Sequence, residues 1–531
     1  MLERRSARLH LPGGNPMEIN YTQRLLIRSL AVLTVLRWII AGLHELTPRE
    51  AQLLETLRHP ALVGIDGGHL TAWCAGIGTV FFQDNALGVR FLAPLFLATS
   101  SWMLYRLARS LTGEKTAGWT VALFNLTPMV NLAAVQMRPE TPGVFLLIAG
   151  MALVWRGLRR ASPWDAHWPL AGLLFGAAFL CWYGAIWGII GTMLLLAGSR
   201  RWRGFLRRPG PWLMLADFLL LLWPLADWNR AYAMAGYYQW RDRLFPPGAG
   251  LDGMAPLELS GQWLALISPV MLGAMIWALW KAGKQWRSSD PARFLTAFAV
   301  PPLAMALLCS LTAGARAASM APALPALCLA LPWAWENHLT NLPLKNHLQW
   351  LCVLPALILT PLTLDTDLLR HAGIPITYSR DRTRDWRGWS LTAKEATIII
   401  QEVLPQAAGG LFLLAEDERL ASILNYHLPP SLNVMRPTVR HPTVQIPSSP
   451  VPESDYHFWP GYASTSQKRS AYEGRTALYF TTSSAADAPA SLRTSFNDVR
   501  PLTIFDTLQR GLPLRRLKVF ICYAYQPEYS N

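Results

Sequence analysis

The stretch "LTPREAQLLETLRHPALVGIDGGHLTAW", Leu46–Trp73, decides how the chain is organised. It follows an apolar run at Leu25–Leu43 and precedes another at about 89–108, each near the ~20 residues that a helix needs to cross a bilayer. The carboxylates of the stretch, with the one directly before it, are Glu45, Glu50, Glu55 and Asp66. A polar, acidic segment between two such runs is expected at one surface of a membrane.

The composition of the whole chain agrees with a membrane protein. Its 531 residues are 52% hydrophobic and 15% charged, well below the ~25% of charged residues in a typical soluble domain. The net charge of +15 does not indicate nucleic acid, because a nucleic-acid binder would gather its Lys and Arg into a basic stripe beside groove-reading elements. Here the basic residues form short clusters between apolar runs, as topology signals do, so we expect no nucleic-acid partner.

The cysteines indicate neither a disulfide framework nor a zinc site. Five of the six lie in or beside apolar runs, which leaves Cys522 alone in the polar C-terminal part.

Eleven apolar segments are expected to span the membrane. They lie at about 25–43, 89–108, 118–136, 141–157, 168–182, 183–198, 211–227, 261–280, 293–312, 318–335 and 346–364. The polar and basic segment 1–24 precedes the first, and no small-residue cleavage pattern follows that run. We therefore expect a cytoplasmic N-terminal segment and a retained anchor rather than a removed signal peptide.

The basic clusters set the expected orientation. With the N-terminus in the cytoplasm, the cytoplasmic loops carry Arg106, Arg109, Lys115, Arg156, Arg159, Arg160, Arg200, Arg201, Arg203, Arg207, Arg208, Lys281, Lys284, Arg287 and Lys345. Every strong cluster then lies on one side, as the positive-inside rule requires. This orientation needs Leu70–Phe82 to be a shorter helix at the outer interface, which its length of about thirteen residues favours. The first loop, 44–88, is then periplasmic.

The region 365–531 differs in character from the membrane part and is expected on the same outer side. It contains strand-like runs, "ATIII", "GLFLLA", "TALYFTT" and "LKVFICYAY", and a helix-like stretch, "EDERLASILNYHL". Short strands alternating with helices indicate a small α/β or α+β domain. The predicted organisation is therefore a transmembrane domain at 25–364 followed by a periplasmic C-terminal domain.

Acidic residues in an outer loop suit a reaction that needs a general base beside a lipid-borne substrate. A carboxylate can accept the proton of an attacking hydroxyl or amine, or hold a metal that binds a phosphate leaving group. "HPALVGIDGGH" places Gly and His around Asp66, which is compatible with a tight turn, but its spacing matches no zinc motif. A divalent cation therefore stays open, and an ordinary solvated loop is the alternative.

The order of motifs along the chain resembles a known family. "PREAQLL" and "GIDGGHLTAW" resemble "DEAYYW" and "GYFDHPPLVAW" in the first outer loop of bacterial GT-C membrane glycosyltransferases, the family 39-type group of protein O-mannosyltransferases and the lipid A aminoarabinose transferase. Further motifs follow in family order: "LGVRFLAP", "NLTPM", "RPETP", "SPVMLGAMIWALWKA", "RGW", "LAEDERLASILNYHLP", "DYHFWPG" and "GRTALYF". Each motif is weak alone, but together they run from Pro48 to Phe480.

The resemblance implies a polytopic α-helical membrane protein of GT-C type, with about 11 transmembrane helices, in the bacterial inner membrane. It would transfer a sugar from a polyprenyl-phosphate donor to a periplasmic acceptor, which could be lipid A, a protein or another glycan. The implied site has Glu50 as the base or metal-positioning carboxylate and Asp66 as a second catalytic carboxylate. Arg138 and Arg316 would contact the phosphate, and Glu140, His69 and Tyr183 would support the cavity. Arg138 and Arg316 could equally be surface cations that snorkel.

Departures from the family pattern leave two other classes open. The family's first-loop Asp, its implied base, aligns with Arg49, and its "SKY" is "CWY" at Cys181–Tyr183. A catalytically inactive binding or assembly subunit with the same fold is therefore an alternative. A transporter is disfavoured, because it would carry coupling charges near the bilayer midplane in repeated halves, and we see no internal repeat.

Two further features have competing interpretations. Arg37 lies inside the first span, where a charge is costly unless it faces protein, water or a headgroup, and we expect it to snorkel to the interface. The aromatic segment Asp227–Phe245 has the composition of an interfacial anchor, and a lid over the site is the alternative.

Overall fold

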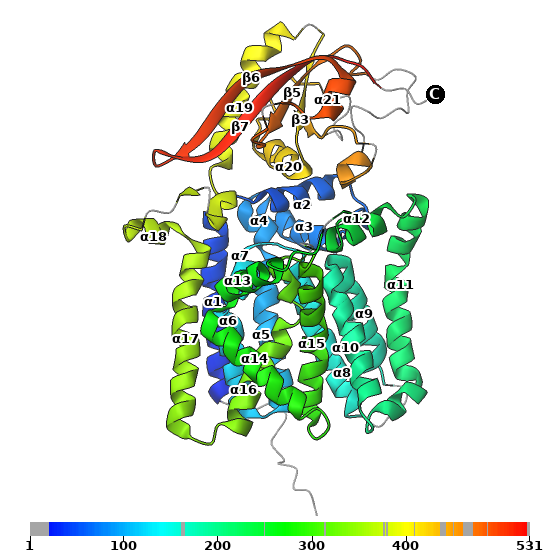
Figure 1. The fold of residues 1–531 in the computed structure, drawn as a ribbon, viewed down its shortest axis with the longest axis vertical. Helices are drawn as coiled ribbons and strands as arrows, with labels where there is room; N and C mark the ends of the chain where they lie inside the picture. Colours follow the sequence, from blue (N-terminus) through cyan, green and yellow to red (C-terminus); the bar gives the residue numbers. More distant parts are fainter. Residues whose placement is uncertain are drawn as a thin grey trace, which may run out of the picture.

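The structure, a computed structural model, describes residues 21–527 apart from 161–164, 249, 313–314, 375–376, 379–380, 408, 436–441, 450, 460–470 and 486. The described chain has two layers along its long axis, a bundle of helices and, above it, a β-sheet with its own helices (Figure 1). The helices of the first loop lie between these two layers.

Six helices are long and apolar enough to cross a membrane, judged by length and composition. They are Tyr21–Leu43 (α1), Ala86–Leu111 (α4, Ala86–Arg90, with α5, Leu92–Leu111), Glu140–Leu158 (α8), Pro209–Ala231 (α11), Asp290–Ser310 (α15) and Leu342–Leu364 (α17). Two bent pairs raise the number to eight if each pair is one span. The multi-span prediction is therefore confirmed, although the eleven expected spans are not all reached by helices of sufficient length.

The missing spans correspond to helices shorter than a bilayer requires. The expected spans at 168–182, 183–198 and 318–335 are α9 (His167–Cys181), α10 (Ile186–Gly198) and α16 (Leu324–His338), with 15, 13 and 15 residues. Apolar composition alone predicted their presence but could not set their length. The short helix expected at Leu70–Phe82 is present as α3, with 13 residues.

Each bent pair breaks directly before a proline. The axes of α6 (Glu114–Leu126) and α7 (Pro128–Val135) differ by 66°, and those of α13 (Ala255–Ile267) and α14 (Pro269–Lys284) by 107°. A proline lacks the backbone N–H and pushes the preceding residue out of the α region. Thr127 accordingly has extended angles. Ser268 has φ of 97°, which is rare for residues other than glycine and which the following proline does not by itself explain.

Arg37 is buried at the first of these breaks, which corrects the expectation that it snorkels. Its side chain is 2% exposed, and its Nη2 donates to Oδ1 of Asn125 at 3.1 Å and of Asn131 at 2.8 Å. Asn131 in turn donates to the carbonyls of Asn125 and Thr127. The guanidinium therefore helps to satisfy polar groups that the break exposes inside the bundle, where water cannot.

Small residues allow the helices of the bundle to approach closely. A Cβ atom at Gly172 of α9 would lie 2.1 Å from the carbonyl oxygen of Met214 in α11. A Cβ at Gly150 of α8 would lie 2.4 Å from the ring of Phe175 in α9. Close packing through glycine is the usual way in which membrane helices associate, and it holds α8, α9 and α11 side by side.

The first loop forms α2 (Pro48–Arg58) and a short hairpin. Thr47 and Glu50 form a capping box that starts α2, with Pro48 in its first turn. Strands β1 (Val63–Gly64) and β2 (Gly67–Gly68) pair in antiparallel fashion, and Gly67 has φ of 116°, which favours glycine. Asp66 therefore lies in a tight turn, as the sequence predicts.

The C-terminal region contains a five-stranded sheet in the order β4-β3-β5-β7-β6. Its strands are β3 (Leu411–Ala415), β4 (Val444–Gln445), β5 (Thr476–Thr481), β6 (Phe496–Gln509) and β7 (Leu512–Tyr525). Strand β3 pairs in parallel with β4 and β5, while β5, β7 and β6 pair in antiparallel fashion. The mixture of strands and helices agrees with the expected α/β or α+β class, while the domain boundary at 365 stays a prediction.

One strand expected in this region is wrong. The run "ATIII" lies inside α19 (Trp389–Val403), whose buried positions include Ala393, Ala396, Ile400 and Val403. These positions follow the spacing of one helical face, whereas a short β-branched run alone does not distinguish strand from helix. The other helices of the outer layer and C-terminal region are α12 (Ala235–Leu244), α18 (Asp367–His371), α20 (Glu418–His427) and α21 (Ala490–Ser495).

Glu45 links the first loop to the C-terminal region. Its carboxylate accepts hydrogen bonds from the backbone N–H of Trp389 at 2.7 Å, at the start of α19, and from the hydroxyl of Ser390. A carboxylate at a helix N-terminus is favoured by the unpaired N–H groups and the helix dipole. Glu45 is therefore a structural contact between the two layers.

Candidate functional site

Glu50, which the sequence predicts as the catalytic base or metal-positioning carboxylate, lies inside the protein, and both of its carboxylate oxygens accept hydrogen bonds. Oε1 accepts from Nε of Arg90 at 2.7 Å and the backbone N–H of Met137 at 3.0 Å. Oε2 accepts from Nη2 of Arg90 at 2.6 Å and from the backbone N–H and hydroxyl of Thr47, each at 3.0 Å. The Glu50 and Arg90 side chains are each 1% exposed. The catalytic role of Glu50 stays a prediction, and this geometry does not favour it.

The electrostatics of Glu50 agree with a structural ion pair. Burial raises the pKa of Glu50, but the charge and hydrogen bonds of Arg90 and two backbone N–H bonds bring it below its ordinary value. Arg90 also donates to the carbonyls of Ala41, His44 and Glu45. The pair therefore joins the end of α1, the start of α2 and the segment before α8. Because it fixes the backbone of Met137, it also fixes the position of the next residue, Arg138.

The hairpin that carries Asp66 is held by a residue from the C-terminal region. Oδ1 of Asp455 accepts from the backbone N–H of Ile65 at 2.8 Å, and its Oδ2 lies 3.0 Å from Nε2 of His69. On the other side, a Cβ at Gly67 would lie 2.8 Å from the hydroxyl of Tyr183. His69 and Tyr183 therefore lie beside the hairpin that carries Asp66, and their supporting role in the site stays a prediction.

Asp66 itself is partly open to solvent and faces α12. Its Oδ1 lies 2.6 Å from Nη2 of Arg243, and its side chain is 32% exposed. Burial raises the pKa of Tyr183, and the charge of Asp66 raises it further. The phenol therefore stays protonated and available as a hydrogen-bond donor next to this carboxylate.

Four arginines from separate parts of the chain gather near Asp66, and we call them the arginine cluster: Arg49, Arg138, Arg316 and Arg419. Burial lowers the pKa of Arg49 to about 10, with further lowering by the other three arginines and an opposing effect of Glu140. Burial lowers the pKa of Arg316, and the charges of Arg419 and Arg243 lower it further. The charges of Asp66 and Glu140 raise it in part. The guanidiniums therefore lie within each other's electrostatic field.

The arginine cluster carries more positive charge than its neighbours balance. Arg138 lies 3.6 Å from Glu140, the first residue of α8. Among the residues that the structure describes, Arg49, Arg316 and Arg419 form no ion pair with a carboxylate. Like charges gathered without counter-ions destabilise one another unless an anion binds between them. The arrangement is suited to a phosphate group.

Glu418 is a second carboxyl beside this cluster, one residue before Arg419 in the first turn of α20. Its Oε2 accepts a hydrogen bond from the hydroxyl of Ser454, the neighbour of Asp455. Its pKa is raised to about 7 by burial and by the charges of Asp66 and Asp455, with Ser454 and Arg243 acting in the opposite direction. A carboxyl with this pKa changes its protonation near neutral pH.

The structure brings most predicted site residues together and adds several. The residues of one region are Asp66, Arg138, Arg316, Glu140, His69 and Tyr183. Glu50 is instead buried in its pair with Arg90. Sequence reasoning missed the roles of Arg49, Arg243, Glu418, Arg419 and Asp455. Glu418, Arg419 and Asp455 lie within "LAEDERLASILNYHLP" and "DYHFWPG", which were singled out as family-like, but nothing local in these motifs indicates contact with a loop almost 400 residues earlier.

No metal step is supported by the side chains present. Over the described ranges of the chain, no group of three or more His, Cys, Asp or Glu residues is placed to hold a metal ion. Asp66 and Asp455, the acids nearest the hairpin turn, are engaged by Arg243 and by His69 and Ile65. We therefore derive no chemistry through a metal.

The aromatic segment Asp227–Phe245 forms the end of α11 and all of α12, across the outer end of the bundle (Figure 1). The rings of Trp228 and Tyr232 contact the ring of Phe458 in the C-terminal region. Ala233 and Met234, directly before α12, have φ of 49° and 62°, which is strained for residues other than glycine. α12 also carries Arg243 to Asp66, so both the anchor and the lid interpretation stay open.

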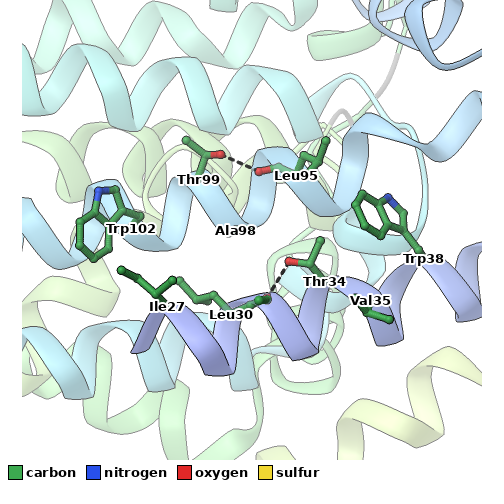
Figure 2. Close-up of a pocket in the computed structure, with 10 residues that line it drawn as sticks. Ile27, Leu30, Thr34, Val35, Trp38, Leu95, Ala98, Thr99 and Trp102 are labelled. Atoms are coloured by element: carbon green, nitrogen blue, oxygen red, sulfur yellow. Dashed lines mark hydrogen bonds between the residues drawn. The ribbon is translucent and has the colours of Figure 1, made fainter. Parts of the chain in front are cut away.

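A separate apolar groove of about 470 Å³ runs between α1 and α5 (Figure 2). Three of its polar side chains are bonded within the protein: Thr34 and Thr99 donate to the carbonyls of Leu30 and Leu95, and Trp38 donates to that of Phe91. The groove therefore has the chemistry of a hydrocarbon-facing surface rather than of a reaction site.

Comparison with known proteins supports the resemblance seen in the sequence. Residues 66–228 match the family model described as dolichyl-phosphate-mannose-protein mannosyltransferase. No curated protein matches the chain by sequence. The fold is similar to that of ArnT from Cupriavidus metallidurans bound to undecaprenyl phosphate, with a TM-score of 0.58 and 13% identity over 93% of this chain and 97% of that one.

The apo state of the same ArnT is similar at a TM-score of 0.56 and 14% identity, over 94% of this chain and 98% of that one. The oligosaccharyltransferase AglB from Archaeoglobus fulgidus aligns more weakly, with a TM-score of 0.46 and 12% identity over 76% of this chain and 64% of that one. The resemblance to GT-C glycosyltransferases is confirmed by the family model and by the ArnT-like fold.

Proposed function

We propose that this protein is a membrane glycosyltransferase that moves a sugar from a polyprenyl-phosphate donor to an acceptor at the outer face of the bacterial inner membrane. The observation that carries the proposal is the arginine cluster, in which three guanidiniums lack a carboxylate partner among the described residues. Guanidinium is well suited to phosphate because of its planar set of donors and its permanent charge. In this proposal the C-terminal region is periplasmic.

The chemistry of transfer fits the charge of the cluster. When the acceptor attacks the anomeric carbon, the phosphate leaves as a monoester and gains one negative charge. Groups that bind this developing charge more strongly than the donor's original charge lower the barrier. Arg138 and Arg316 would contact the phosphate, with Arg49 and Arg419 beside them, and a single in-line displacement would invert the anomeric centre.

The similarity to ArnT supports the class of donor. That protein has been solved with undecaprenyl phosphate bound, a lipid with the phosphate and the long apolar tail that the proposed donor would have. The sugar and the acceptor, whether lipid A, another glycan or a protein, stay undetermined.

A binding or assembly subunit is the second candidate function. It is favoured by Glu50, because the acid that the sequence offers in place of the family's Asp is occupied by five donors. Such a subunit would hold a polyprenyl phosphate without transferring its sugar.

One experiment separates the two functions. The lipids and glycans of cells with and without the gene are compared by mass spectrometry, and a catalytically normal gene is returned to the deletion strain. An enzyme is expected to account for one sugar on one product, which disappears with the gene and returns with it. An unchanged profile, together with binding of undecaprenyl phosphate by the purified protein, would favour the binding subunit.

A further inference from the structure

We infer that Glu418, from the C-terminal region, is the group that accepts the acceptor's proton during transfer; this rests on the proposed function. Glu418 lies in the first turn of α20, and α20 packs against α2, the helix that carries Arg49. Its carboxyl is bonded to Ser454, whose neighbour Asp455 holds Ile65, the residue before Asp66. The geometry therefore places Glu418 beside both the Asp66 turn and the arginine cluster.

Each of the other carboxylates near the cluster lies within 4 Å of a cationic side chain or accepts two hydrogen bonds. Asp66 is paired with Arg243 at 2.6 Å, and Glu140 lies 3.6 Å from Arg138. Asp455 uses one oxygen for Ile65 and the other for His69. Glu418, by contrast, has no cation within 4 Å in the described part of the chain, and the partner that the structure gives it is a hydroxyl. It is the carboxyl with capacity to accept a proton.

The charges around Glu418 suit a general base near neutral pH. Asp66 and Asp455 face it and raise its pKa, and Arg243 lowers it, with a result of about 7. The helix α2 contributes Arg49 and the Glu55–Arg58 pair on its packed side, while the charged residues of α19 are exposed, namely Lys394, Glu395 and Glu402. A base is most effective when its pKa lies near the working pH.

The proposed step balances in atoms and charge. The acceptor's hydroxyl or amine forms a bond to the anomeric carbon, and the bond between that carbon and the phosphate oxygen breaks. Its electron pair leaves with the polyprenyl phosphate, which becomes a monoester beside the arginine cluster. The proton of the acceptor passes to the ionised carboxylate of Glu418, which later releases it to water.

The test uses the full-length protein in detergent, mixed with membranes from cells that lack the gene as the source of unused donor and acceptor. Product is measured by mass spectrometry over a range of pH on both sides of 7. Wild-type transfer should fall about tenfold per pH unit below about pH 7, because the base is then protonated. Glu418→Gln should reduce transfer by at least ~10²-fold and abolish this dependence.

Two further variants distinguish a proton acceptor from a structural residue. Glu418→Asp keeps a carboxylate and should retain the pH dependence at a lower rate. Glu395→Gln, at an exposed position of α19, should match the wild type.

Burial and the nearby acids raise the Glu418 pKa above its ordinary value of 4.5, so ionising it costs stability as pH rises through about 7. Glu418→Gln should therefore melt at a higher temperature than wild type at alkaline pH.

Binding of undecaprenyl phosphate separates this inference from the proposed function. Glu418→Gln should bind it as well as the wild type does while losing transfer. If this variant binds it and transfers normally, or keeps the wild-type pH dependence, the inference is wrong and the proposed function stands. If the wild type does not bind undecaprenyl phosphate at all, the proposed function is wrong, and the inference that rests on it is wrong as well.

Discussion

Arg49 and Glu50 are adjacent in the sequence but belong to two very different charged regions. Glu50 and Arg90 form a buried pair in which five donors occupy one carboxylate. Arg49, in the same helix turn, lies among the arginines of the cluster, of which Arg138 has a carboxylate, Glu140, within 4 Å in the described part of the chain. The charges of the first region balance within the protein, whereas we propose that an anionic ligand balances those of the second. Charge balance therefore distinguishes an ion pair that holds the fold from an arginine cluster that we propose to be an anion site.

The Glu50–Arg90 pair and the arginine cluster should both lie on the outer side of the membrane. A reporter fused after Asp365 should be active only in the periplasm, and one fused within 200–208 only in the cytoplasm. The expected effect is all or none, because the basic residues of 200–208 favour the cytoplasmic side. A fusion after Asp365 that is inactive in the periplasm would show that the arginine cluster does not lie on the side of the membrane where we propose the acceptor to be.

Breaking the buried pair should have the largest effect among the substitutions. Arg90→Ala leaves the Glu50 carboxylate buried without its cation and should destabilise the protein by about 3–5 kcal/mol. We expect loss of folded protein in detergent, measured by thermal unfolding and by size-exclusion chromatography. Arg516→Ala, in the exposed pair with Asp506, is the control and should leave the melting temperature unchanged. A fully stable Arg90→Ala protein would show that the pair does not hold the first loop.

Replacing Asp66, the carboxylate near the arginine cluster, should change the pH dependence of transfer and should have a smaller effect than breaking the buried pair. Asp66 raises the pKa of Glu418, so Asp66→Asn should lower that pKa from about 7 towards its ordinary value. Because the base then ionises at lower pH, the midpoint of the pH dependence of transfer should move down. The same measurement on Asp498→Asn, in an exposed pair with Arg500 far along the sheet, should give the wild-type midpoint. An unmoved midpoint in Asp66→Asn would mean that the two carboxyls do not interact.

The sequence predicted the broad class better than the details, and physical reasons explain the difference. Apolar runs predict helices but do not set the length of a helix such as α16, and "ATIII" fits a strand as well as one face of α19. The order of motifs indicated the family resemblance, and the glycines around Asp66 indicated a turn.

The roles of Glu50 and Glu418 could not be predicted in the same way. Glu50 forms a capping box that is visible in "TPRE", yet its burial depends on Arg90, forty residues later. Glu418 acquires its environment only when α20 packs against the first loop. Contacts between such distant segments are decided by tertiary packing, on which local patterns carry no information.

The central claim is that the arginine cluster binds the phosphate of a polyprenyl lipid, and the most direct test compares undecaprenyl phosphate with undecaprenol. Binding of each to the purified protein is measured for the wild type, Arg316→Ala and Arg316→Lys. We expect the phosphate to bind much more tightly than the alcohol, a loss of about 10- to 100-fold in Arg316→Ala, in line with a charged hydrogen bond of ~1.5–3 kcal/mol, and partial retention in Arg316→Lys. Equal binding of the two lipids, or an Arg316→Ala protein that binds the phosphate like the wild type, would contradict the account.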